Sequence, residues 1–188
     1  MTSEFRPNQH SILILVRALN TGGAERQALL NAISLQKLGY HVDIACFYDS
    51  NAGGYVLSNS KISKVILSNK QGSISRCAIN FIKLIVKKKY SVVYSFTGGP
   101  NLIALLAKIV RKRTIVIWGK RATKLNSQDY GFKYSIEIYL EKLLFRFPDL
   151  IISNSDACKV ELEEEGFPSR SVITIHNAID THIFRPKK

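Results

Sequence analysis

The sequence predicts a doubly wound α/β domain, with a mostly parallel sheet and helices on both of its faces. Short apolar segments rich in β-branched residues alternate along the chain with longer stretches in which apolar residues recur at helical spacing. This alternation is typical of strand–helix–strand units that wind a parallel sheet. The chain has 188 residues, 46% of them hydrophobic and 22% charged, which is enough for one such domain and too short for two.

The first half of the chain contains four expected strands and two expected helices. The strands are, in order, Ser11 to Arg17, Val42 to Phe47, Lys64 to Leu67 and Val92 to Phe96. One helix runs from Ala24 to Leu38 and ends at Gly39, a residue suited to a left-handed C-cap. The other runs from Ile74 to Lys87. Its spacing predicts one apolar face formed by Ile74, Ala78, Ile82 and Ile85.

The second half continues the alternation. Thr97-Gly98-Gly99-Pro100 is expected to break the chain before a helix from Asn101 to Val110. The remaining strands are expected at Thr114 to Trp118, Leu150 to Ser153 and Val172 to His176. Between them we expect a polar loop from Gly119 to about Tyr130, an amphipathic helix over about Lys133 to Phe145, and a helix from Asp156 to Glu165 capped by Gly166.

The charge balance favours an anionic partner. The formal net charge is +13 and the pI is about 9.8, so nucleic acid, membrane phospholipid and phosphorylated small molecules all qualify. Charge alone does not choose among them. The cationic clusters are Lys83 with Lys87, Lys88 and Lys89, then Lys108 with Arg111, Lys112 and Arg113, then Lys120 with Arg121 and Lys124.

Several patterns are missing from the sequence. No apolar run approaches the roughly 20 residues that cross a bilayer, and the polar N-terminal stretch lacks the layout of a secretory signal, so we expect a cytoplasmic protein. The three cysteines, Cys46, Cys77 and Cys158, stand singly among apolar neighbours and are expected to be buried free thiols. The histidines show no ligand spacing, so no metal site is expected.

Polar and glycine-rich segments follow the expected strands. In open parallel sheets ligands bind beyond the carboxyl ends of the strands, so these segments are the candidate site. They are residues 17–26, 97–100, 119–121, 154–156 and 177–180.

Gly22 and Gly23 stand directly before a helix and are candidates for a phosphate contact. Glycine lacks the Cβ that would block an anion, and a helix N-terminus carries partial positive charge. The alternative is that the two glycines only make the turn. The pattern is neither G-x-G-x-x-G nor a P-loop. Glu25, in the first turn, either complements the helix dipole or contacts the ligand.

Five of these segments together resemble, in order and spacing, the N-terminal domain of the GT4-type glycosyltransferases. They are residues 22–26, 92–96, 118–121, 151–155 and 177–186. The resemblance covers nearly the whole chain and implies the GT-B architecture, in which two Rossmann-like domains face each other across a cleft. Residues 11–180 would then form the acceptor-side domain, preceded by a polar tail at 1–10 and followed at 181–188 by the start of a linker toward a C-terminal donor domain.

The resemblance also implies roles for residues. Gly22 and Gly23 would close over the diphosphate of a nucleotide-sugar donor, and transfer would retain the anomeric configuration without a metal or other cofactor. The acceptor, a sugar or a lipid-linked sugar, would lie against a second set of residues. This set is Tyr94, Phe96, Gly98, Gly99, Lys120 and Asn154, although Tyr94 and Phe96 at a strand end also fit the core. Asn177 and Asp180 would lie at the edge between the two domains.

The sequence departs from the family pattern at two positions and at its end. Arg121 stands where many relatives have a histidine, and a guanidinium is a poor general base but can pair with a phosphate or carboxylate. We therefore expect Arg121 to act electrostatically, with a plain surface cation as the alternative. Ala178 stands where relatives commonly have glycine. The sequence ends at Lys188, before any counterpart of the donor-binding residues, so we expect this chain alone to be inactive until a donor domain is supplied in cis or trans.

Other functions stay open from the sequence alone. The basic end of the helix from Ile74 to Lys89 fits a helix lying on anionic lipid, which would make the protein peripheral at the inner face of a membrane, but it equally fits a solvated helix end. A Rossmann-type oxidoreductase is compatible with the fold but lacks G-x-G-x-x-G. A nucleic-acid-binding module would interleave aromatic and basic residues on one surface, whereas these lysines gather at helix ends.

Overall fold

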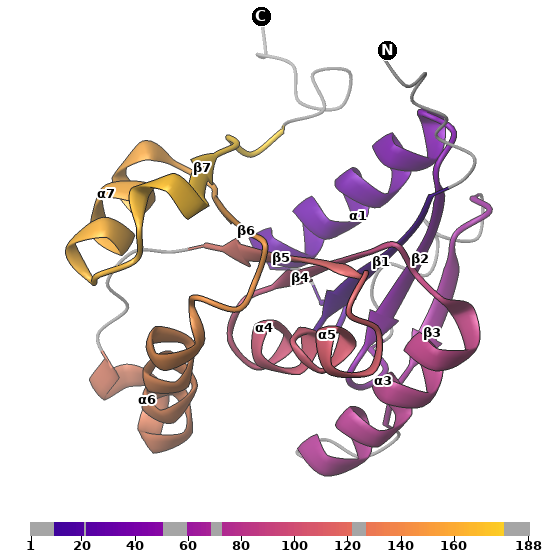
Figure 1. The fold of residues 1–188 in the computed structure, drawn as a ribbon, viewed down its shortest axis with the longest axis horizontal. Helices are drawn as coiled ribbons and strands as arrows, with labels where there is room; N and C mark the ends of the chain where they lie inside the picture. The colour runs from indigo at the N-terminus through magenta and orange to yellow at the C-terminus, as the bar shows by residue number, and fades with distance from the viewer. Residues whose placement is uncertain (1–9, 21, 51–59, 69–72, 122–126, 179–188) are drawn as a thin grey trace, which may run out of the picture.

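A single parallel sheet organises the computed structural model, which describes residues 10–20, 22–50, 60–68, 73–121 and 127–178, with side chains omitted for 127–134. The sheet contains seven strands in the order β3-β2-β1-β4-β5-β6-β7, every neighbouring pair of which is parallel. The strands are β1 Ser11–Val16, β2 His41–Cys46, β3 Ser63–Ile66, β4 Val92–Phe96, β5 Ile115–Lys120, β6 Leu150–Ser153 and β7 Val172–Thr174. The predicted doubly wound α/β class is confirmed (Figure 1).

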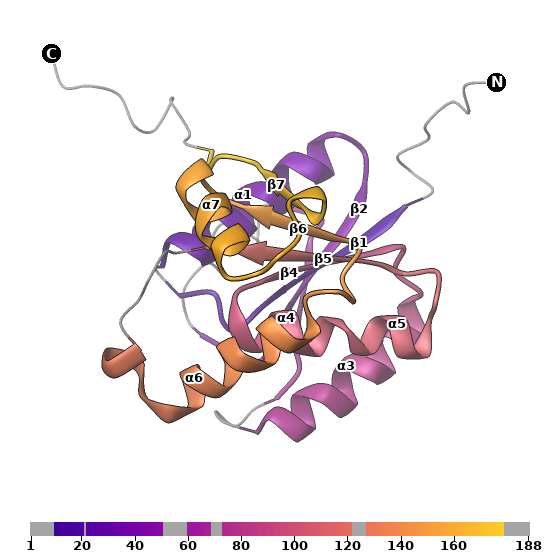
Figure 2. The same cartoon turned by 60° about the vertical axis from the view of Figure 1, so that its left-hand side comes forward.

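Helices cover both faces of this sheet. The helices are α1 Gly23–Lys37, α3 Ile74–Lys88, α4 Gly98–Ala104, α5 Leu106–Val110, α6 Ser127–Leu144 and α7 Asp156–Glu164, with a short 3-10 turn at Ser169–Ser171. Helix α1 lies on one face, and α3, α4, α5 and α6 lie in a row on the other (Figure 2). This is the arrangement that right-handed crossovers between parallel strands produce.

Two apolar clusters form the core, one on each side of the sheet. Ile12, Ile14 and Val16 of β1 pack with the small side chains of Ala28 and Ala32 on α1. The opposite cluster is larger and contains Leu13 and Leu15 of β1 together with buried residues of α3, α4, α5 and α7. Successive residues of β1 therefore point to opposite clusters, as the period of a strand requires. None of the described helices is long and apolar enough to cross a membrane.

Helix α3 buries a different face from the predicted one. Its buried residues are Cys77, Phe81 and Ile85, whereas Ile74, in the first position of the helix, is 58% exposed. Of the predicted face of Ile74, Ala78, Ile82 and Ile85, Ile85 is buried and Ala78 packs partly buried against the core, whereas the prediction is wrong at Ile74. Burying a Phe ring removes a large apolar surface from water, and Phe81 is fully buried while Ala78 beside it packs against the same core.

Two helix boundaries also differ from the prediction. The segment Gly98-Gly99-Pro100 forms the first turn of α4, and a break at Leu105 separates α4 from α5. Glycine and proline are tolerated there because first-turn N–H groups have no partner within the helix. Helix α6 begins at Ser127, inside the predicted loop. The sequence did not indicate a helix there because these first turns are polar and carry no apolar periodicity.

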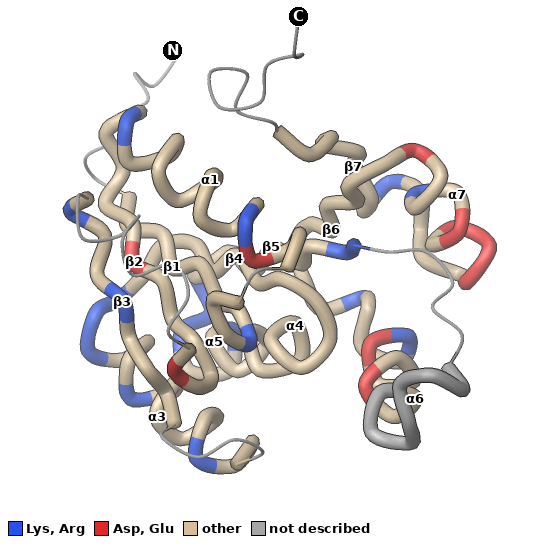
Figure 3. The backbone as a smooth tube through the Cα atoms, turned by 180° about the vertical axis from the view of Figure 1, so that it is seen from behind, with Lys and Arg blue, Asp and Glu red and all other residues tan. Residues whose placement is uncertain are grey.

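Charged residues are unevenly distributed over this frame. Lys and Arg lie along α3, which carries no acidic residue, whereas Asp and Glu gather on α6 and α7 (Figure 3). Helix α3 is therefore strongly basic, without acidic residues to offset its charge.

The three cysteines are free and buried, as predicted. Burial raises the pKa of the Cys46 thiol to about 12 and also raises the pKa of Cys77 and Cys158. Because only the thiolate is nucleophilic, we expect iodoacetamide at about pH 8 to leave the folded chain unlabelled. Mass spectrometry should find all three thiols alkylated after denaturation. Rapid labelling of any cysteine in the native chain would contradict this assignment.

Candidate functional site

The carboxyl ends of all seven strands meet at one edge of the sheet, because every pair is parallel. Arg17 follows β1, Thr97 follows β4, Arg121 follows β5 and Asn154 follows β6. The predicted site segments are thereby brought to one side of the domain. Asp180, which was predicted at the edge between the two domains, lies outside the described residues.

Arg121 is held in a defined position at this edge. Its guanidinium carbon lies 4.7 Å from the centre of the Phe96 ring, and its Nη1 donates a hydrogen bond to Oδ1 of Asn177. Burial lowers the pKa of Arg121, and the phenol of Tyr94 partly opposes this shift. A guanidinium remains charged under these conditions, so the group offers fixed positive charge and N–H donors rather than a base. Its Nε has no hydrogen-bond partner among the described residues.

Tyr94 and Phe96 are buried and support the side chain of Arg121. Their ring centroids are 4.4 Å apart, and burial raises the pKa of Tyr94 while the charge of Arg121 opposes the rise. Gly119, paired with Phe96 across β4 and β5, makes room for them. A Cβ on Gly119 would lie 2.9 Å from the Ser95 carbonyl oxygen and 3.3 Å from the Tyr94 ring.

The glycine turn before α1 is open on one side. Gly22 is the N-cap of α1 and Gly23 its first residue, and both are exposed. The Glu25 carboxylate folds back over Gly22, where an added Cβ would lie 2.2 Å from Oε2. No atom lies within 4 Å of a Cβ built on Gly23. Glu25 thus occupies one side of the turn, and the space over Gly23 is unfilled.

Gln27 ties the end of the described chain to α1. Its Nε2 donates to the Ala178 carbonyl at 2.5 Å, and its Oε1 accepts from the Ala178 N–H at 3.1 Å. Gln27 is buried, and these two bonds satisfy its amide. The contact brings Asn177 and the glycine turn to the same part of the edge. In the sequence, the one signal for this contact is that the polar amide of Gln27 stands among the inward-facing residues of α1.

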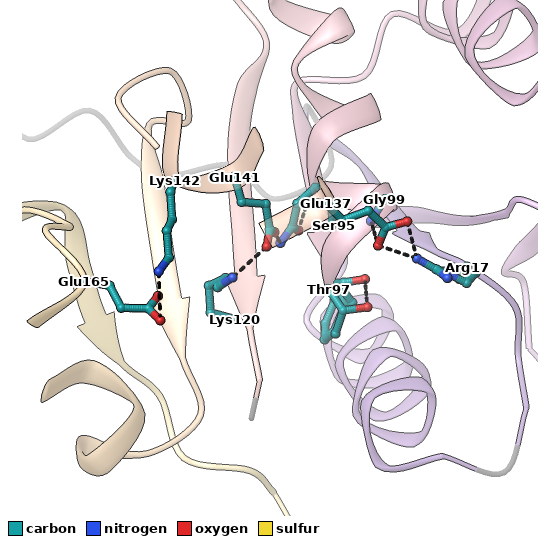
Figure 4. Close-up of polar contacts among 11 residues, drawn as sticks. Arg17, Ser95, Thr97, Gly99, Lys120, Glu137, Glu141, Lys142 and Glu165 are labelled. Atoms are coloured by element: carbon teal, nitrogen blue, oxygen red, sulfur yellow. Dashed lines mark hydrogen bonds and ion pairs between the residues drawn. The ribbon is translucent and has the colours of Figure 1, made fainter. Parts of the chain in front are cut away.

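Helix α6 presents two glutamates to the sheet edge, one turn apart (Figure 4). Glu141 is 2% exposed, and its two oxygens accept from Nδ2 of Asn101 at 2.6 Å and from Nζ of Lys120 at 2.7 Å. Asn101 in turn accepts from the Ser95 hydroxyl at 2.7 Å. Lys120, which the sequence suggests for the acceptor cleft, is therefore engaged in a buried network that connects β4, α4, β5 and α6.

Glu137 occupies the space over Gly98 and Gly99. Its carboxylate oxygens accept from Nη2 of Arg17 at 2.8 and 2.7 Å, and the Gly99 N–H donates to Oε2 at 3.1 Å (Figure 4). A Cβ on Gly98 would lie 2.3 Å from Oε2 of Glu137, and one on Gly99 would lie 3.3 Å from Oε1. The two glycines suggested for the acceptor cleft thus leave room for an internal carboxylate.

The turn at Thr97 is strained. Thr97 has φ 64° and ψ 154°, a region almost restricted to glycine, and Gly98 follows with φ 21°. A non-glycine residue in this region costs about 1–3 kcal/mol. The Thr97 N–H bonds the Gly119 carbonyl at 3.1 Å, and this contact helps to hold the turn against β5. Such strain is typical of positions where function requires a fixed backbone.

Asn154 contributes an unsatisfied acceptor near the same edge. Its Oδ1 is buried without a hydrogen-bond partner among the described residues. Ser155, the next residue, caps α7 by accepting from the Cys158 N–H at 3.1 Å. Within the described part of the chain, no group of three or more His, Cys, Asp or Glu side chains could hold a metal ion.

The sequence did not single out Arg17, Asn101, Glu137 or Glu141 as site residues. Glu137 and Glu141 carried a usable signal, because two charges spaced by four residues interrupt an otherwise apolar stretch of α6. Arg17 lies within one of the segments that follow the predicted strands and Asn101 lies directly after another, but nothing in the sequence distinguished them from their neighbours.

The fold and the edge define a Rossmann-like domain. The sequence profile of glycosyltransferase family 4 matches residues 21–183, and the chain belongs to that family. No curated protein matches the chain closely enough to be named.

Solved structures share the fold at low sequence identity. HepE from Anabaena, in complex with UDP-glucose, has a TM-score of 0.71 and 18% identity over 92% of this chain and 45% of its own. UDP-N-acetylglucosamine 2-epimerase from Rickettsia bellii has a TM-score of 0.61 and 14% identity, over 89% and 45%. MurG from Acinetobacter baumannii has a TM-score of 0.61 and 16% identity, over 91% and 46%. The chain thus spans about half the length of these proteins.

We expect Gly98→Ala to destabilise the domain by about 2 kcal/mol, because the new methyl group would displace Glu137 and strain a positive φ. Urea unfolding measures this change. Gly23→Ala is the matched control, since its methyl group meets open space in a helix and should leave stability unchanged or slightly higher. Equal stability of the two variants would show that Glu137 does not need the space over Gly98.

Proposed function

We propose that this chain is the acceptor-side domain of a glycosyltransferase that moves a sugar from a nucleotide-sugar to a sugar or lipid-linked acceptor in polysaccharide or glycolipid synthesis. The observation that carries the proposal is Arg121, a partly buried cation seated on Phe96 beside Asn177 at the edge where the strands end. Membership of glycosyltransferase family 4 supports this function over an oxidoreductase or a nucleic-acid-binding module.

In this proposal Arg121 stabilises negative charge. When the bond between the sugar and the nucleotide breaks, charge develops on the leaving diphosphate, and a fixed guanidinium in a water-poor site lowers the energy of that state. The open turn at Gly22 and Gly23 would take up another part of the diphosphate through backbone N–H groups. The complex of HepE with UDP-glucose supports a UDP-sugar as the donor to test first.

A second domain would supply the rest of the donor site, in cis or as a separate chain. The matching structures are about twice as long as this chain, which supports a two-domain enzyme. The acceptor would then lie between this edge and the second domain, near Asn154 and the turn at Thr97.

The donor hypothesis gives a first measurement. Titration calorimetry of this chain with UDP- and GDP-sugars should show no micromolar binding, because most donor contacts would come from the other domain. In the two-domain enzyme, Arg121→Ala should lower kcat about a hundredfold, the usual effect of removing one charge-stabilising donor. Its melting temperature should change little, and Arg121→Lys should retain part of the activity. Unchanged turnover of the alanine variant would exclude Arg121 from the chemistry.

We also propose that the domain lies on an anionic membrane surface through its layer of α3, α5 and α6. The outward side of α3 alternates apolar and basic groups, with Ile79 and Val86 exposed beside Lys83 and Lys87. Ile109 on α5 and Tyr139 and Leu143 on α6 add exposed apolar groups. Apolar insertion combined with basic charge is the pattern of an interfacial surface.

Vesicle cosedimentation tests the membrane proposal. The chain should pellet with vesicles that contain phosphatidylglycerol and stay in solution with pure phosphatidylcholine. Lys83→Glu combined with Lys87→Glu should weaken binding by about tenfold or more, since each basic residue near such a surface is worth about 1 kcal/mol. Lys37→Glu, an exposed change on α1 across the sheet, is the control. Equal loss in the control, or equal binding to neutral vesicles, would contradict a specific membrane face.

A further inference from the structure

The ion pair of Arg17 and Glu137 is the accessible part of the polar edge. The two α6 glutamates differ in this respect, since the Glu141 side chain is 2% exposed and the Glu137 side chain is 16% exposed. Arg17 is 45% exposed. Both oxygens of Glu141 are engaged by Asn101 and Lys120. Glu141 therefore fastens α6 to the sheet, and Glu137 faces the space in front of the edge.

The pair retains unused hydrogen-bonding capacity. Arg17 uses only Nη2 toward Glu137, and its Nε and Nη1 have no partner among the described residues. A carboxylate offers about four acceptor positions, and Glu137 accepts from Arg17 on both oxygens and from Gly99 on one. The pair thus places exposed N–H donors of Arg17 beside a carboxylate acceptor that is partly exposed.

The backbone that surrounds this ion pair is conformationally strained. Glu137 fits only because residues 98 and 99 lack side chains, and the turn that brings the Gly99 N–H to it passes through the strained φ of Thr97. An ion pair needed only to attach α6 would not require strain, since Glu141 already makes that attachment in ordinary geometry. Strain at a solvent-facing pair is instead typical of a binding position.

Neighbouring donors and acceptors match the chemistry of a sugar ring. Each hydroxyl of a vicinal pair both donates and accepts, so one hydroxyl can donate to the carboxylate while the next accepts from the guanidinium. We propose that Arg17 and Glu137 bind two adjacent hydroxyl groups of the acceptor sugar and so help to determine which acceptor is used. This inference rests on the proposed glycosyltransferase function. It assigns binding of the acceptor sugar to two residues that lie outside the family motifs.

Protein NMR on this chain tests the assignment directly, because the Gly99 amide and the Arg17 Nε–H are built-in reporters. The probes are methyl α-glucopyranoside, methyl α-galactopyranoside and methyl α-mannopyranoside, together with deoxy analogues that lack one ring hydroxyl. At least one glycoside should shift both reporters, and loss of one hydroxyl of the bound pair should weaken binding by about tenfold, as expected for a hydrogen bond to a charged group. Inorganic phosphate serves as the anion probe and should shift them less.

Two variants separate recognition from folding. Glu137→Gln should abolish the glycoside shifts at Gly99 while the thermal unfolding temperature stays near that of the unchanged chain, and Arg17→Lys should restore part of the affinity lost in Arg17→Gln. Glu141→Gln is the matched control, expected to lower stability but to leave the glycoside shifts in place wherever the chain is folded. Glycosides that leave both reporters unshifted, shifts that persist in Glu137→Gln, or a stronger response to phosphate would overturn the assignment.

The test of this sugar site and the test of the proposed enzyme activity can fail independently. Binding of glycosides at Arg17 and Glu137 without any sugar transfer by the two-domain enzyme would reject the enzyme and keep the sugar site. Sugar transfer with an acceptor KM unchanged by Glu137→Gln would keep the enzyme and reject the site.

Discussion

The buried contact between Glu141 and Lys120 is the interaction on which the carboxyl edge depends. It joins α6 to β5, and through Asn101 and Ser95 it reaches α4 and β4. Removing one partner of such a buried pair typically costs about 3–5 kcal/mol, because the other charge is left without compensation. By comparison, the exposed pair between Lys142 on α6 and Glu165 at the end of α7 is worth at most about 1 kcal/mol. Helix α6 is therefore attached mainly by charges that point inward, while apolar Tyr139 and Leu143 point outward.

The position of Arg121 follows from this attachment and from one glycine. Lys120 precedes Arg121 in the chain, so fixing the ammonium of Lys120 also limits how the next backbone unit can move. Gly119 lets the rings of Tyr94 and Phe96 lie close to β5, and the guanidinium rests on the second of them. Asn177, positioned by the hydrogen bonds between Gln27 and the neighbouring Ala178, accepts a hydrogen bond from the guanidinium. A guanidinium that already contacts the Phe96 ring and the Asn177 side chain loses little conformational freedom when it binds a charged ligand.

The fold could be predicted from the sequence because its signals are local. Apolar runs such as residues 12–16 and 92–96 indicate strands, and the segments that follow them predict where a ligand would bind. The buried face of α3 was only partly predicted, since Ile74 stands at the exposed first position of the helix and only the packed structure shows that Cys77 and Phe81 are buried instead. Gly22, Gly98 and Arg121 were identified as site positions, but what touches them was not. Glu137 reaches Gly99 across 38 residues, and Gln27 reaches Ala178 across 151, so no local pattern announces either contact.

The close approach of Glu137 to Gly98 also constrains how this lineage can evolve. An Oε2 placed 2.3 Å from where a methyl group would stand means that residue 98 cannot gain a side chain while Glu137 keeps its present position. A descendant that acquires a side chain at position 98 must first shorten or lose the carboxylate, and Arg17 then loses its partner. Among homologues, these three positions should therefore covary as a unit, and their joint replacement would mark a branch in which this part of the edge has been rebuilt.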